Sequence, residues 1–152
     1  MSIQEWGQVT WYLFHTLAEK IRPEYFNEEK GNIFKHINNI CSILPCPDCK
    51  SHALNYLKNI NSSMITNKEQ LKLFLMNFHN NVNSRHQKKL FTIEEVNNKY
   101  KHANLYNIIN GFLKTYNKPS GTMRINLLGT LDKKRNLKEF TSWIQSIFFK
   151  FF

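Results

Sequence analysis

The chain has few residues of the types that cross-link a protein or interrupt regular structure. Its 152 residues include only three cysteines, five glycines and four prolines. So few turn-forming residues disfavour a disordered chain or an all-β fold, and the aromatic content of 14% suits compact helical packing. The odd number of cysteines excludes a framework made only of intramolecular disulfides, the usual arrangement in small secreted domains. The length is that of a single domain with one core.

Long hydrophobic runs are missing too. The sequence contains no apolar run of the about eighteen residues that a membrane span needs, and residues 1–11 lack the basic start and apolar segment of a signal peptide. We therefore expect no membrane span, no export and a cytoplasmic location. Because the cytosol keeps ordinary disulfides reduced, closely spaced cysteines there indicate redox chemistry more than a structural link.

Acidic residues are scarce, since eleven Asp and Glu face twenty-one Lys and Arg, for a formal charge of +10. Such a charge attracts nucleic acid, an anionic membrane or an acidic protein, and does not choose among them. One alternative function is therefore a basic helical module that binds nucleic acid, with Lys133-Lys134-Arg135 contacting phosphates. That alternative gives the cysteines no role, so we expect that no nucleic acid is required.

Apolar residues recur at helical spacing through most of the chain. Arg22-Pro23 ends the first helix because the residue before a proline avoids the helical region, and Thr92 with Glu95 forms a capping box that starts a short one. Helices are expected at about residues 7–21, 30–43, from Pro47 onward, 68–87, 92–100, 105–116 and 137–151. Residues 122–131 have a pattern that also allows an extended segment.

The segment Cys46-Pro47-Asp48-Cys49 can close a small reducible disulfide or hold a metal. Pro47 suits the first turn of a helix, where the free amides and the helix dipole lower a thiol pKa from about 8.5. A thioredoxin-like fold is disfavoured because no βαβ unit is visible. A dithiol that works repeatedly in a helical protein needs a separate electron acceptor, and flavin is the obvious candidate.

A structural zinc site is the other alternative. Cys41, Cys46, Cys49 and His52 are spaced closely enough to offer three thiolates and one imidazole. Such a protein would be colourless and would unfold with chelators, whereas a flavoprotein would be yellow.

Gly7, Trp11 and His15 fall at helical intervals of four, so a strip of one helix face combines a missing side chain, an indole and an imidazole. A flat ligand could lie along that strip. His79 and Asn83 lie one turn apart on a later helix, with Asn80 beside them, and their groups suit ribose, adenine and pyrophosphate.

These segments together resemble the Erv/ALR family of FAD-linked sulfhydryl oxidases. The resemblance covers about residues 6–100 and is carried by Trp6-Gly7, by Thr10-Trp11 through His15, by Leu44 to Cys49 with His52, and by His79-Asn80-Asn81-Val82-Asn83 with Lys88. It implies an all-α fold, a four-helix bundle plus a short fifth helix, with a C-terminal helical extension. The residues that it implies for FAD binding are Gly7, Thr10, Trp11, His15, Cys49, His79, Asn80, Val82, Asn83, Lys88 and Tyr100, with no metal.

The same resemblance implies a different role for each of the two thiols. Cys49 would lie nearest the flavin, and Cys46 would face an incoming protein dithiol. Electrons would pass from the substrate through the Cys46–Cys49 pair to FAD and then to molecular oxygen, which gives hydrogen peroxide.

The resemblance also implies partners and boundaries. Residues 1–101 would form the FAD-binding domain, and residues 102–152 would pack on it or at an oligomer interface. Because only Cys41 remains for a second pair, we expect direct reaction with a partner, such as a small redox relay protein. Relatives dimerise through their early helices, which predicts a homodimer, and a viral member would work in the host cytoplasm or the virion.

Overall fold

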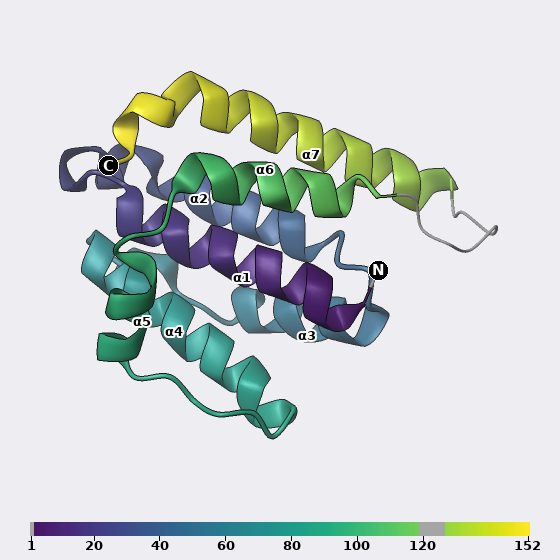
Figure 1. Cartoon of the computed structure of the whole chain (residues 1–152), viewed down its shortest axis with the longest axis horizontal. Helices are drawn as coiled ribbons and strands as arrows, with labels where there is room; N and C mark the ends of the chain where they lie inside the picture. Colours follow the sequence, from purple (N-terminus) through teal and green to yellow (C-terminus); the bar gives the residue numbers. More distant parts are fainter. Residues whose placement is uncertain (1, 119–126) are drawn as a thin grey trace.

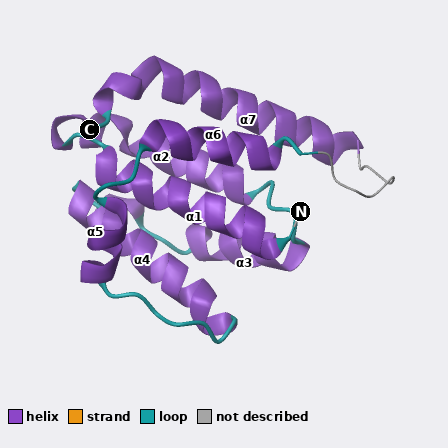
Figure 2. Cartoon of the chain, in the orientation of Figure 1, coloured by secondary structure: helices purple, strands orange, loops and turns teal. Residues whose placement is uncertain are grey.

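The computed structural model describes residues 2–118 and 127–152, and most of these residues are helical (Figures 1 and 2). The α-helices are α1 (Ile3–Lys20), α2 (Phe26–Cys41), α3 (Pro47–Lys58), α4 (Lys68–Arg85), α5 (Ile93–Tyr100), α6 (Leu105–Tyr116) and α7 (Leu127–Ile147). Short 3₁₀ turns occupy Pro23–Tyr25, Ser62–Met64 and Phe148–Lys150. The predicted all-α fold is confirmed.

Helix boundaries follow from local capping. Helix α1 begins at Ile3, four residues earlier than predicted, because Ser2 and Glu5 form a capping box in which the Glu5 amide donates to the Ser2 hydroxyl at 3.1 Å. The capping box predicted at Thr92 and Glu95 is present and starts α5. Pro47 occupies the first turn of α3, as predicted.

One prediction about the C-terminal third is wrong. Residues 127–131 were expected to allow an extended conformation, but they form the first turns of α7. The apolar side chains of Leu137, Phe140 and Ile144 bury one face of this helix, and helix propagation from a packed segment costs little per residue. The remaining part of that prediction, 122–126, lies outside the described residues.

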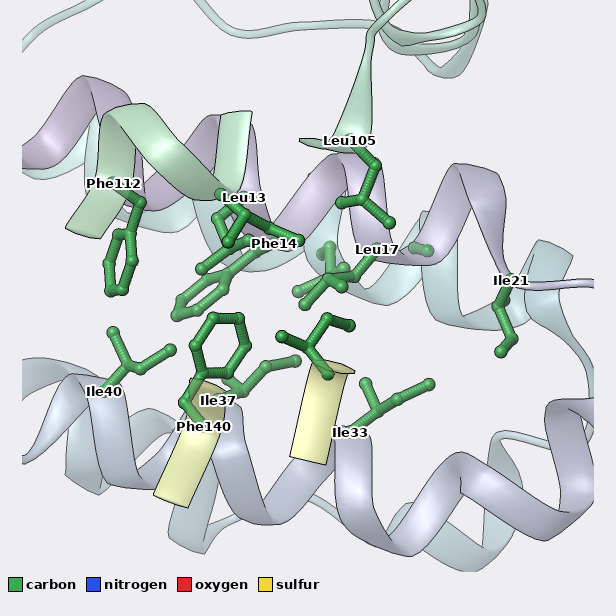
Figure 3. Close-up of a cluster of buried hydrophobic side chains, with 14 of the residues drawn as sticks. Leu13, Phe14, Leu17, Ile21, Ile33, Ile37, Ile40, Leu105, Phe112 and Phe140 are labelled. Atoms are coloured by element: carbon green, nitrogen blue, oxygen red, sulfur yellow. The ribbon is translucent and has the colours of Figure 1, made fainter. Parts of the chain in front are cut away.

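Helix α1 lies near the centre of the molecule, with α4 and α5 on one side and α6 along another (Figure 1). Helix α2 packs against both α3 and α7. The facing surfaces of α1 and α2 form the core, and side chains of α6 and α7 enter it (Figure 3). Its members include Leu13, Phe14, Leu17, Ile33, Ile37, Ile40, Phe112 and Phe140. The extension and the bundle therefore share one apolar core.

A buried carboxylate fastens the end of the chain to α2. Glu29 is only 4% exposed and accepts hydrogen bonds from Lys150 Nζ at 2.6 Å, Trp143 Nε1 at 3.1 Å and Asn32 Nδ2 at 3.1 Å. Burying a charge without partners would be costly, and these three donors offset that cost. His36 of α2 stacks on the Trp143 ring with 4.5 Å between ring centroids.

None of the helices in residues 2–118 and 127–152 combines the length and the apolar character that a bilayer crossing requires.

We expect the variant Phe140→Ala to destabilise the whole protein by about 3–5 kcal/mol, because removing a fully buried ring leaves a cavity in the shared core. Urea unfolding followed by circular dichroism measures the change. Lys138→Ala, on the exposed side of the same helix, is the matched control. A Phe140→Ala protein as stable as the control would mean that α7 contributes nothing to the core.

Candidate functional site

A cavity of about 420 Å³ opens between the first half of α1, the start of α3, and α4 with the segment that follows it. This volume lies within the range of about 300–1,000 Å³ that is typical of small-molecule sites. Its wall is mostly apolar and aromatic, with cationic side chains around part of it. Lining residues not named in the sequence analysis as cofactor contacts include Tyr12, Ala53, Phe78, Arg85, Phe91 and Lys99.

A disulfide joins Cys46 to Cys49 at the N-terminus of α3, with 5.2 Å between the two Cα atoms. Cys46 is the N-cap residue, and its sulfur accepts a hydrogen bond from the Cys49 amide at 3.2 Å. Cys49 lies in the cavity wall, whereas Cys46 is not one of the lining residues. The two sulfurs therefore differ in access, because only Cys49 borders the cavity.

The thiol outside this pair is Cys41, which is buried and also borders the cavity. Burial raises the pKa of Cys41 to about 12, so it stays protonated at neutral pH. Among the described residues no three His, Cys, Asp or Glu side chains are grouped to hold a metal ion. The zinc alternative required such a group at Cys41, Cys46, Cys49 and His52, and the structure does not assemble it.

An aromatic stack links α1 to α4. The Trp11 indole lies parallel to the His79 ring, with 4.1 Å between centroids and 7° between planes. His79 Nδ1 is 3.0 Å from His15 Nε2, so one proton bridges the two rings, and the His15 ring stacks on Tyr100 at 4.7 Å. Trp11, His79 and Tyr100 of this row line the cavity.

Both imidazoles are held neutral. Burial, reinforced by His79 and Lys99, lowers the pKa of His15 to about 3. Burial, reinforced by Lys99 and Lys88, lowers the pKa of His79 to about 4. The other nitrogen of His15, Nδ1, is buried and has no hydrogen-bond partner among the described residues.

Gly7 marks the open part of the wall. A Cβ atom added there would meet no atom within 4 Å, and Gly7 is one of the residues that line the cavity. The strip of α1 predicted to take a flat ligand is therefore open at this position.

Cations gather at one side of the cavity. Arg85, Lys88, Lys89 and Lys99 all line it. Lys89 pairs with Glu95 at 3.2 Å, Arg85 pairs with Asp48 at 3.4 Å, and the Lys99 ammonium lies 5.0 Å from the centre of the Tyr12 ring. Within the described chain Lys88 has no carboxylate partner, which leaves its charge available to an anionic ligand.

The sequence reasoning identified Lys88 and missed the other three cations. A signal for Arg85 was present, since it follows Val82 by three residues and so lies on the same face of α4. Lys89 and Lys99 reach the cavity through the path of the chain after α4, which the sequence does not reveal.

The side-chain amides of Asn80 and Asn83, both predicted to bind the cofactor, form hydrogen bonds with the backbone. The Asn80 side chain donates to the Phe91 carbonyl and accepts from the Phe91 amide, both at 2.8 Å, and Asn80 does not line the cavity. Asn83 donates to the Lys89 carbonyl at 3.2 Å and remains in the cavity wall. These bonds fix the segment that carries Lys88, Lys89 and Phe91 beside the cavity.

The structure thus gathers most of the predicted cofactor residues around one cavity. His15 lies behind His79, and Asn80 lies outside. The predicted residues that line the wall are Gly7, Thr10, Trp11, Cys49, His79, Val82, Asn83, Lys88 and Tyr100.

The fold and the site define a class of protein, a helical bundle with a disulfide at a helix N-terminus against an aromatic, cation-edged cavity. The sequence profile of the Erv1/Alr family matches residues 8–101, which is more than half of the chain. The chain therefore belongs to the Erv1/Alr family.

Named relatives agree with this assignment. The chain is similar to the FAD-linked sulfhydryl oxidase of African swine fever virus (isolate Warthog/Namibia/Wart80/1980), with 33% identity over 103 residues, 68% of this chain and 86% of the relative. It is also similar to the mitochondrial FAD-linked sulfhydryl oxidase ERV1 of Saccharomyces cerevisiae, with 24% identity over 59% of this chain and 47% of that one. The FAD-linked sulfhydryl oxidase ERV1 of Arabidopsis thaliana shows 26% identity over 61% and 48%, respectively. No solved structure matched the chain.

We expect the free energy of unfolding to fall as the pH is lowered from about 6.5 toward about 4. In the unfolded chain each histidine binds a proton near a pKa of about 6.5, whereas burial lowers the folded-state pKa of His15 to about 3 and those of His36 and His79 to about 4. The unfolded chain therefore binds more protons across this window, and acid favours it.

Urea titrations at several pH values measure this dependence. The variant His79→Gln should show a shallower slope of stability against pH, and His102→Gln, at an exposed position, should keep the wild-type slope. Equal slopes in all three proteins would contradict the burial of a neutral imidazole pair.

Proposed function

We propose that this protein is an FAD-dependent sulfhydryl oxidase that forms disulfides in protein dithiols and passes their electrons to molecular oxygen. The observation that carries the proposal is that the Cys46–Cys49 disulfide borders, through Cys49, the same cavity that holds the Trp11–His79 stack and the cations. Family membership and the names of the relatives support the same reaction class and cofactor.

The cavity residues fit FAD on separate grounds. The space over Gly7 and the flat rings of Trp11 and His79 suit an aromatic ring system. Lys88 and its neighbouring cations suit a pyrophosphate.

The thiol exchange begins at Cys46. A substrate thiolate attacks the Cys46 sulfur, the Cys46–Cys49 bond breaks, and Cys49 leaves as a thiolate at the first turn of α3, where the amides and helix dipole stabilise it. A second substrate thiolate then attacks the substrate sulfur of the mixed disulfide and releases Cys46. The products are one substrate disulfide and one reduced Cys46–Cys49 pair.

Bound FAD would accept the two electrons of that pair and pass them to O₂, which yields H₂O₂. The chain itself contributes by placing the two cysteines differently relative to the cavity. Cys49 borders the cavity and Cys46 does not, so the proposal gives Cys49 the role of electron donor to the cofactor and Cys46 the role of substrate contact.

Three cysteines leave no second dithiol to shuttle electrons, which supports direct reaction with a dithiol protein such as a small redox relay protein. We also propose a homodimer and a cytoplasmic site of action. Because α6 covers one side of α1 and α7 packs on α2, the two copies would meet through other surfaces of these helices.

We expect purified protein loaded with FAD to be yellow and to consume oxygen when a dithiol is supplied. Cys49→Ala should lower this oxygen uptake to the level of a protein-free control, because the electrons then have no path from the substrate to the cofactor. An oxygen electrode measures the uptake, and blue absorbance measures the bound flavin.

Ser51→Ala, on the exposed face of α3, is the matched control and should keep full turnover. Cys49→Ala should retain its yellow colour, since the rest of the cavity wall is unchanged. Wild-type turnover in Cys49→Ala would exclude the proposed route.

A further inference from the structure

Tyr116 connects the C-terminal extension to the cavity wall. It is the last residue of α6, it is 1% exposed, and its ring packs on Phe112 with 4.4 Å between centroids. Its hydroxyl lies 2.6 Å from Thr10 Oγ1 on α1, and Thr10 lines the cavity. Tyr116 lies outside the 8–101 segment that matches the family.

The Trp6 carbonyl determines which group donates in each of these hydrogen bonds. Thr10 Oγ1 is 2.6 Å from the Trp6 carbonyl, which can only accept, so the Thr10 hydroxyl donates its single proton there. Tyr116 must then donate to Thr10. Burial also raises the pKa of Tyr116, which keeps the phenol a proton donor at ordinary pH.

The Thr10 side chain is therefore held by two hydrogen bonds, one to Trp6 of its own helix and one from Tyr116 of α6. It is only 5% exposed, and it belongs to the cavity wall. The position lies between Gly7, where the wall is open, and Trp11, which stacks on His79.

We infer that Tyr116 is a positioning residue for the cofactor, which holds the Thr10 side chain in place in the wall of the cavity that would take FAD. The inference rests on the proposed function. It gives the C-terminal extension a part in ligand binding, through a side chain that does not itself line the cavity. Without the phenol, Thr10 would keep its bond to Trp6 and lose its link to α6, so only its own helix would hold this part of the wall.

The test is the affinity of the apoprotein for FAD, measured by quenching of flavin fluorescence, in wild type, Tyr116→Phe, Thr10→Val and the double variant. We expect Tyr116→Phe to weaken FAD binding about threefold to tenfold, the range for one neutral hydrogen bond. The matched control is Tyr106→Phe on the same helix, where the phenol is 63% exposed, and it should bind FAD as wild type does.

The double-mutant cycle separates positioning from simple packing. If Tyr116 acts through Thr10, the double variant binds FAD no more weakly than Thr10→Val alone, and the visible absorption band of bound flavin shifts alike in both. Additive losses, or a Tyr116→Phe protein with wild-type affinity, would overturn the inference and leave the proposed function standing. A wild-type protein that takes up no FAD would overturn both.

A second pair of variants covers the case in which Tyr116→Phe does not fold. Thr10→Ser keeps the hydroxyl and should retain affinity, whereas Thr10→Val should lose it. Equal affinities in these two variants would show that the Thr10 hydroxyl is irrelevant, and the role of Tyr116 would fall with it.

Discussion

Helix α1 packs into the core with one face and lines the cavity with another, and the rest of the structure depends on this arrangement. One face buries Leu13 and Leu17 against α2 and the extension, while the other presents Gly7 and Trp11 to the cavity. The 3.6-residue repeat separates the two sets of side chains without any break in the helix. The cavity wall is therefore backed directly by the packed core, which suits a site that must hold a flat ligand beside a disulfide.

The C-terminal third supplies part of that core. Helices α6 and α7 supply Phe112 and Phe140 to the core, and the Glu29 cluster ties the end of the chain to α2. Removing a buried Phe ring typically costs about 3–5 kcal/mol, which is a large part of the free energy of unfolding of an ordinary domain. The extension is therefore part of what keeps the bundle folded.

Much of this architecture can be predicted from the sequence because its causes are local. Periodicity located the helices, Pro47 located the start of α3, and the capping box at Thr92 located α5. The early start of α1 carried an equally local signal in Ser2 and Glu5, so it was predictable as well. The features that escaped prediction depend on contacts between distant segments. The bond from Asn80 to Phe91 and the relay from Tyr116 to Thr10 are of this kind, and no sequence pattern encodes either.

The lysine that reaches Glu29 lies 121 residues away along the chain, and Tyr116 lies 106 residues from Thr10. Helical bundles usually fold quickly because most of their contacts are close in sequence, and long-range closure slows that process. This bundle has both kinds of contact. Its individual helices can form early, but the core behind the cavity is complete only when the last helix docks. The site therefore forms only after the chain has met the entropic cost of closing a loop of nearly its whole length.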